Sequence, residues 1–100
     1  MTGLLDLEHL IIKLREATNE LSRLHRELGT IRGTRFRIKA EAWRDIDAPS
    51  VAAGERAIAI QTIDLDVDEA WLRADIDSWQ AEVLYLTTAI QVASGHAAQH

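Results

Sequence analysis

The residues most able to carry a function are the basic and aromatic side chains in the first half of the chain. Between Ser22 and Arg44 there are seven basic residues and two acidic ones. Arginine and lysine bind phosphate groups, and tryptophan can stack on unpaired bases. We therefore predict that this segment contacts single-stranded nucleic acid or another partner. The predicted contact residues are Arg32, Arg35, Arg37, Lys39, Arg44 and Trp43.

A second interpretation of the same residues is open. From Ile46 to the end the chain has two basic and nine acidic residues, so the basic segment can pair with acids of the second half or of another subunit. The net charge of −5 also argues against strong non-specific DNA binding. The three tryptophans can equally fill gaps in a subunit interface, where this residue type is enriched.

The acidic residues of the second half do not form a metal site. Asp64, Asp66 and Asp68 are spaced like the start of a calcium loop, but Glu69 stands where that loop requires glycine. We instead predict that Asp66 caps a helix and that Glu69, three residues later, completes a capping box.

The sequence does not indicate an enzyme. It has no cysteine, which excludes thiol nucleophiles and thiolate zinc sites. His96 and His100 are four residues apart but have no third ligand nearby. No glycine-rich phosphate loop or serine-nucleophile motif is present. We therefore predict a protein without catalytic residues, metal or cofactor.

An apolar heptad repeat places the basic segment on a long helix. The repeat predicts a helix over about residues 4–45 that packs along its length on another helix. Gly29 and Gly33 lie on one face of it and indicate either a kink or the close approach of another backbone. The two sets of repeating positions are Leu7, Leu14, Leu21, Leu28, Arg35 and Ala42, and Leu10, Ala17, Leu24, Ile31, Ile38 and Asp45.

A chain reversal is predicted at residues 46–50. Pro49 is the only proline, Asp47 or Ser50 can cap the next helix, and Pro49 suits the first turn of that helix. The second helix should cover about residues 51–93, followed by a frayed tail over 94–100. Its apolar stripe is formed by Ile58, Leu65, Leu72, Ile76, Trp79, Val83, Leu86, Ile90 and Ala93.

Two helices of nearly equal length joined by a short turn must lie antiparallel. We therefore predict one all-α domain over residues 1–100, a long, coiled-coil-like antiparallel helical hairpin. The alternative is a short two-stranded piece between two helices, because residues 34–40 and 61–68 alternate polar and apolar residues.

A hairpin of this length has a marginal core, so we expect it to form a homo-oligomeric bundle. No apolar run is long enough to span a bilayer and no secretory signal is visible, so a cytoplasmic protein that does not contact membranes is expected. The predicted oligomer interface consists of Leu14, Leu21, Leu28, Leu72, Trp79 and Leu86.

Helix-forming residues surround the predicted proline-serine turn in a set of short stretches. These are Lys39-Ala-Glu-Ala-Trp-Arg44, Pro49-Ser-Val51, Glu55-Arg56, Ala59, Thr62, Asp68-Glu-Ala70, Leu72-Arg-Ala-Asp-Ile76, Glu82 and Leu86. Through these stretches the chain resembles, over about residues 14–90, a family of small helical-hairpin proteins encoded by actinobacterial bacteriophages. The resemblance implies a helper of phage recombination or of single-strand handling, located in the host cytoplasm.

Three other functions remain as alternatives. The chain also resembles secreted WXG-type helical hairpins in its length and in Trp43 near the turn, but Asp45 stands where that motif requires glycine. The tyrosine-based export signal of that family is not evident around Tyr85. A virion or scaffold component and an inhibitor of a host protein are the other two alternatives.

Overall fold

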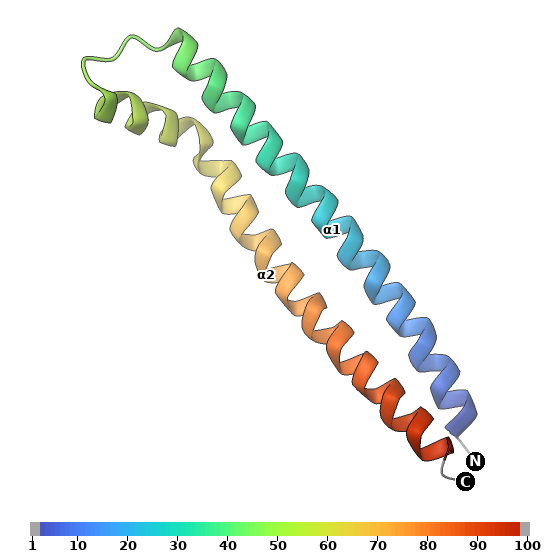
Figure 1. The fold of residues 1–100 in the computed structure, drawn as a ribbon. Coiled ribbons are helices and arrows are strands. Elements are labelled where there is room, and N and C mark those ends of the chain that lie inside the picture. Colours follow the sequence, from blue (N-terminus) through green and yellow to red (C-terminus); the bar gives the residue numbers. More distant parts are fainter. Residues whose placement is uncertain (1–2, 99–100) are drawn as a thin grey trace. The chain divides into compact units, whose positions relative to one another are not determined.

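The chain consists of two long helices joined by a short loop. The computed structural model describes residues 3–98, and the side chains of residues 6–95. Helix α1 covers Gly3–Asp45, helix α2 covers Val51–Ala98, and the chain reverses in the loop between them (Figure 1). The described residues contain no strand. The predicted all-α helical hairpin is therefore confirmed.

Both segments for which strands were the alternative are helical throughout. Residues 34–40 belong to α1 and residues 61–68 to α2. Ile38 and Leu65 fit the heptad spacing of their helices and are half-buried, so helix packing decides the conformation.

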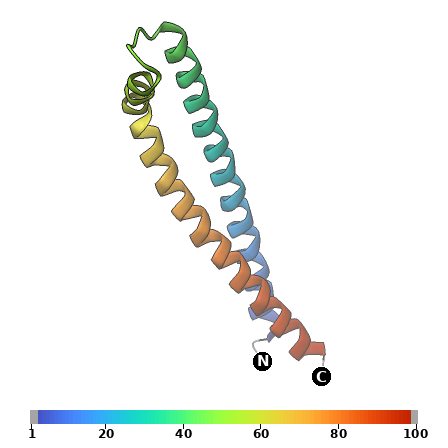
Figure 2. The same ribbon diagram turned by 60° about the vertical axis from the view of Figure 1, so that its left-hand side comes forward.

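The start of α2 is fixed by Ser50. The backbone N–H of Ala53 donates a hydrogen bond to Ser50 Oγ at 3.1 Å, and the N–H of Gly54 donates to the Ser50 carbonyl at 3.0 Å. Ser50, rather than Asp47, is thus the N-cap. Pro49 precedes the cap, so its expected place in the first turn is wrong. Figure 2 shows the loop from a second direction. Pro49 lies in this loop, where the fixed φ of proline is tolerated.

The described residues divide into two compact units, one formed by the chain up to residue 25 and from residue 75 onward, the other by residues 26–74. In the first unit Ala17, Leu24, Ile76 and Leu86 are buried between α1 and α2. The second unit contains the loop and the segments of both helices next to it. Its buried residues are Leu28, Gly54, Ile58, Thr62, Glu69 and Leu72.

The heptad positions predicted from the sequence form the packed face of α1. All of those with described side chains are buried or half-buried, except Asp45 at the helix end, and the predicted stripe of α2 is likewise buried or half-buried. We call these two packed faces together the seam. The seam of α2 also contains Thr62 and Glu69, which precede Ile76 at intervals of seven residues.

The predicted capping box is wrong, because α2 runs without a break through Asp66 and Glu69. No helix begins there, and the side chain of Glu69 turns into the seam. The three-residue spacing of Asp66 and Glu69 matches a capping box, but it occurs here inside a helix, where Glu69 is one of the rare buried acids.

Two further features differ from expectation. Helix α2 continues to Ala98, past the predicted end near residue 93, because Ser94–Ala98 contains no proline and two alanines. Residues 99 and 100 of the predicted tail lie outside the described chain.

At Gly29 and Gly33 an added Cβ would meet nothing within 4 Å, so no backbone approaches them closely. Among the described residues, neither helix has a stretch apolar enough to cross a membrane.

Candidate nucleic-acid interface

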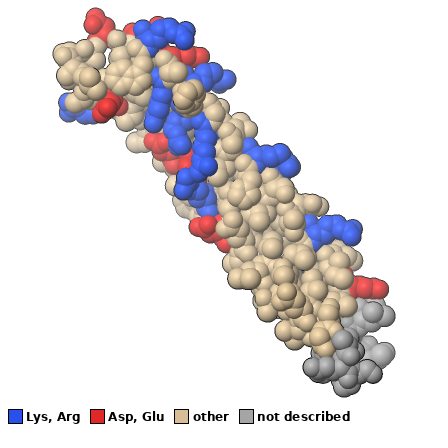
Figure 3. All heavy atoms as spheres, viewed as in Figure 1, with Lys and Arg blue, Asp and Glu red and all other residues tan. Residues whose placement is uncertain are grey.

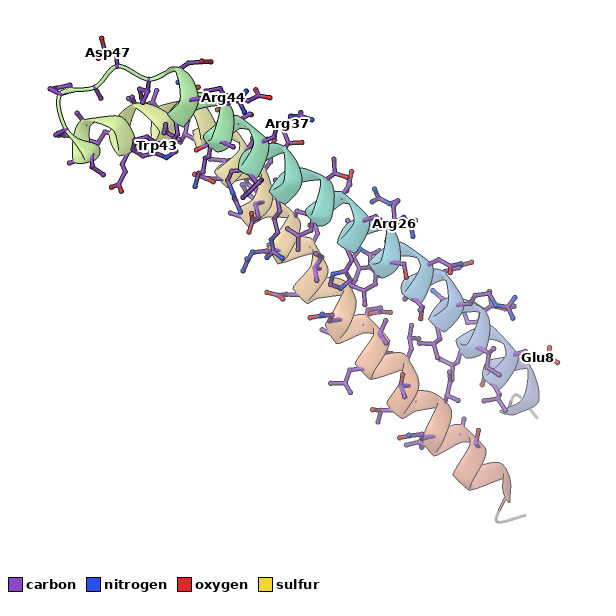
Figure 4. All side chains as sticks on the ribbon, turned by 45° about the horizontal axis from the view of Figure 1, so that its top comes forward. Glu8, Arg26, Arg37, Trp43, Arg44 and Asp47 are labelled. Atoms are coloured by element: carbon purple, nitrogen blue, oxygen red, sulfur yellow. The ribbon has the colours of Figure 1, made fainter. Side chains whose placement is uncertain are left out.

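The outward side of α1 in the second unit carries basic residues around one exposed aromatic ring. A helix turns about 100° per residue, which places Arg26, Arg37 and Arg44 on the side opposite the seam. Figure 4 shows these three side chains projecting away from α2. We call the surface the basic face, and it comprises Arg26, Arg32, Phe36, Arg37, Lys39 and Arg44.

Phe36 lies in the middle of the basic face and is the residue that sequence reasoning missed. Its side chain is 76% exposed. Arg32, four residues before it, and Lys39, three residues after it, are its neighbours along one edge of the helix face. Arg37 lies about 100° further round the helix. The spacing of residues 32, 36, 39 and 43 by three and four indicates that they share one face of a helix. The same segment also alternates polar and apolar residues as a strand does, so the sequence did not single out this face.

Trp43 is only partly available for binding. The side chain is 45% exposed, and its ring lies against the backbone of Gly54, where an added Cβ would be 2.9 Å from Cζ3 of the indole. The label in Figure 4 marks Trp43 on the α2 side of α1. The indole also borders a surface groove of about 330 Å³ that includes the acids Glu55 and Asp66. Those acids make this groove unfavourable for a phosphate.

Arg35 is not free to bind a partner. Its Nη1 lies 3.0 Å from Asp66 Oδ1 and 2.6 Å from Glu69 Oε1. Two more cations reach the same carboxylate: Arg73 Nε donates to Glu69 Oε2 at 2.8 Å, and Arg32 Nε lies 3.6 Å from it. For Arg32 and Arg35 the interpretation that the basic segment pairs with acids of the second helix is correct. Of the six predicted contact residues, Arg35 therefore has a structural role.

The arginines around Glu69 keep its carboxylate charged in the seam. Burial alone would raise the pKa of Glu69, because a low-dielectric environment disfavours the charged form. Contacts from Arg35 and then Arg73 outweigh that effect and hold the pKa below its ordinary value. The cluster is thus an ion-pair network in which Glu69 Oε2 accepts a hydrogen bond from Arg73, while Oε1 is buried in ion-pair contact with Arg35 without a well-aligned hydrogen bond.

The outer arginines have no such partners. Arg26, Arg37 and Arg44 form no ion pair with any side chain that the structure describes. Figure 3 shows Lys and Arg gathered over the part of the molecule near the loop. Exposed cations without an intramolecular anion are available for phosphate oxygens.

The predicted oligomer interface lies inside the hairpin. Leu28, Leu72 and Leu86 are buried, and Leu14, Leu21 and Trp79 are half-buried, all in the seam. Leu28, Leu72 and Leu86 are thus used within the hairpin, whereas Leu14, Leu21 and Trp79 keep part of their surface exposed. The large apolar side chains that remain exposed lie elsewhere, with Trp71 at 71% exposure among them.

The surface also has other grooves, one of them, of about 620 Å³, next to the loop and lined by Glu41, Asp45 and Asp47. A groove of about 250 Å³ in the first unit lies between Lys13, Glu16, Trp79 and Glu82. Among the described side chains, no three His, Asp or Glu residues are grouped so as to hold a metal ion. His96 and His100 lie outside those side chains.

In comparisons with known proteins, no family model, no curated protein and no solved structure matches this chain.

Proposed function

We propose that this chain is a non-enzymatic accessory protein that binds single-stranded nucleic acid, free or within a nucleoprotein complex, through its basic face. The observation that supports this most directly is the exposed ring of Phe36 near Arg37 and Lys39, which form no ion pair with any side chain that the structure describes. Proteins that bind single strands combine basic side chains along the backbone with aromatic rings on which bases stack.

The shape of the surface favours a single strand over a duplex. The basic face lies on one side of a single helix, and Phe36 stands out from it. A base within a duplex is already stacked on its neighbours and cannot lie on a side chain without leaving the stack. The proposal also keeps a phage-type role and a location in the host cytoplasm, which rest on the sequence resemblance alone.

The charge contribution is tested by binding of a fluorescently labelled deoxythymidine oligonucleotide to Arg37→Ala, Arg44→Ala and the double variant. Each arginine that contacts one phosphate should lower the slope of log affinity against log salt by roughly 0.7. Arg56→Ala is the matched control, because Arg56 is an exposed arginine on α2. No binding at low salt, or an equal loss in the control, would contradict the proposal.

The stacking contribution is tested by Phe36→Ala at unchanged charge. Loss of one stacked base should weaken binding by about 1–3 kcal/mol, with an unchanged salt slope. Phe36→Leu separates stacking from simple apolar contact. It retains the bulk but not the π surface, so its affinity should be close to that of Phe36→Ala.

A structural assembly protein is the second candidate. The observation in its favour is a row of exposed apolar side chains on α2, which would be unusual for a monomer. The row consists of Ile60, Ile63, Val67 and Trp71. This candidate predicts a large homo-oligomer by light scattering and no affinity for the oligonucleotide.

A further inference from the structure

A row of apolar side chains on the outward side of α2 lacks a partner in the hairpin. The side chains of Ile60, Ile63, Val67 and Trp71 are 74%, 57%, 49% and 71% exposed. Their spacing of three and four residues places them on one face, opposite the seam residues Ile58, Thr62, Leu65 and Glu69. We call this row the apolar ridge.

The charges beside the apolar ridge indicate what can cover it. Asp64 and Asp68 border it on one edge and form no ion pair with any described side chain. Packing α2 on α2 of a second copy in antiparallel orientation would bring these acids close to each other. In parallel orientation they would meet Asp66 and neutral residues on the other edge. The apolar ridge therefore suits a partner surface with basic borders.

The basic face of α1 has the complementary charge and shape. Between its arginines lie the exposed ring of Phe36 and the glycines Gly29 and Gly33, at each of which an added Cβ would meet no atom beyond the local helix backbone within 4 Å. Bulky side chains of a ridge can enter the space that small residues leave on a facing helix. We propose that the apolar ridge of α2 docks on the basic face of α1 in a second copy of this chain.

This contact joins two different surfaces, because the apolar ridge and the basic face each lie opposite the seam, on different helices. A contact between unlike surfaces is heterologous, so it forms a ring if the rotation closes and an open chain of subunits if it does not. One consequence rests on the proposed function: nucleic acid and a second copy would compete for the basic face.

The proposal is tested by sedimentation velocity of the full chain without nucleic acid, over a range of protein concentrations. The wild type should associate at low salt and dissociate at high salt. Two sets of variants on exposed residues should be monomeric: the ridge variant Ile60→Ser/Val67→Ser and the charge-reversed Arg37→Glu/Arg44→Glu. Leu84→Ser, at an exposed position of α2 outside the ridge, is the matched control and should associate like the wild type. Circular dichroism checks that every variant is helical.

A mixing experiment tests which surfaces meet. Arg37→Glu/Arg44→Glu and Asp64→Arg/Asp68→Arg should each be monomeric alone and should associate when mixed, because each supplies the charge that the other requires. A wild type that is monomeric at all concentrations, or a charge-reversed Arg37/Arg44 variant that associates like the wild type, would overturn the proposal.

The two proposals fail in different ways. Loss of association in the ridge variant leaves the basic face intact, so its affinity for labelled oligonucleotide should match or exceed that of the wild type. If the chain associates but does not bind the oligonucleotide, the docking proposal stands and the proposed function is wrong. If both proposals hold, adding the oligonucleotide should dissociate the wild-type assembly.

Discussion

At the scale of single residues, Glu69 is the group whose charge matters most to the fold. Its pKa lies below the ordinary value of 4.5, because contacts with Arg35 and Arg73 outweigh burial. A carboxyl group with a depressed pKa stabilises the folded state above its unfolded pKa, and this contribution is lost as the pH falls through the folded pKa. Acid should therefore weaken the seam at Glu69.

We predict that Glu69→Gln lowers the unfolding temperature at neutral pH and flattens its decline below about pH 4.5. Thermal unfolding followed by circular dichroism over a pH series measures both effects. Glu41→Gln is the control, since Glu41 is an exposed glutamate of α1. An unfolding temperature whose pH dependence is the same in Glu69→Gln and the wild type would show that this carboxylate does not stabilise the fold.

Gly54 and Trp43 form the second residue-scale test. Alanine is favoured over glycine inside a helix by about 1 kcal/mol, but a Cβ at residue 54 would meet the Trp43 ring at 2.9 Å. We expect Gly54→Ala to stabilise the Trp43→Ala variant by about 1 kcal/mol and to gain less, or lose stability, in the wild type. Chemical denaturation of the four proteins measures the coupling, and equal gains in both backgrounds would contradict this contact.

At the scale of elements, the sequence predicted which residues of each helix pack. Leu86 is 2% exposed in the seam, whereas Leu84 on the same helix is 68% exposed. We expect Leu86→Ala to lower the free energy of unfolding by about 2–5 kcal/mol, and Leu84→Ala to change it by less than about 0.5 kcal/mol. Denaturant titration compares the two, and similar losses would mean that the seam is assigned to the wrong face.

The prediction of helices and of their packed residues is correct where one apolar periodicity dominates. It is wrong where a polar residue occupies a position of the packed face. The leucines of α1 and the lone Pro49 were enough to predict two helices and a reversal. The repeat of α1 correctly predicts Arg35 as a polar seam position, but the spacing of Asp66 and Glu69 predicts a cap and so misplaces the partner of Arg35. Thr62 and Glu69 are polar residues at positions of the apolar stripe. The periodicity of apolar residues therefore could not show that they face α1.

The candidate site was less predictable than the fold for a related reason. Arg35 and Arg37 are both arginines of one helix, yet one lies in the seam and the other on the outside. The residue type does not tell which arginine pairs in the seam and which is exposed. The position of each arginine around the helix does. The exposure of Phe36 depends on the face that α1 turns to α2, so the residue type alone does not predict it.

At the scale of the whole molecule, stability should depend on protein concentration if subunits associate through the apolar ridge. Association that favours the folded state raises the unfolding temperature with protein concentration. We expect that increase at low salt in the wild type and its absence in Ile60→Ser/Val67→Ser. Calorimetry at several concentrations measures it, and an unfolding temperature that is the same at every concentration would indicate that folding and association are independent.

The ion pair of Arg35 and Glu69 also has a consequence for how the helices align. If α2 slid by seven residues along α1, most apolar contacts would be replaced by equivalent ones, since both stripes repeat at that interval. Glu69 would then face Leu28 or Ala42 instead of Arg35, and would keep only the contact with Arg73 of its own helix. A buried charge that loses one of its partners is unfavourable, so the sliding would be penalised at this one level. A single polar layer can thus select one alignment of the helices among several that the apolar residues alone would allow.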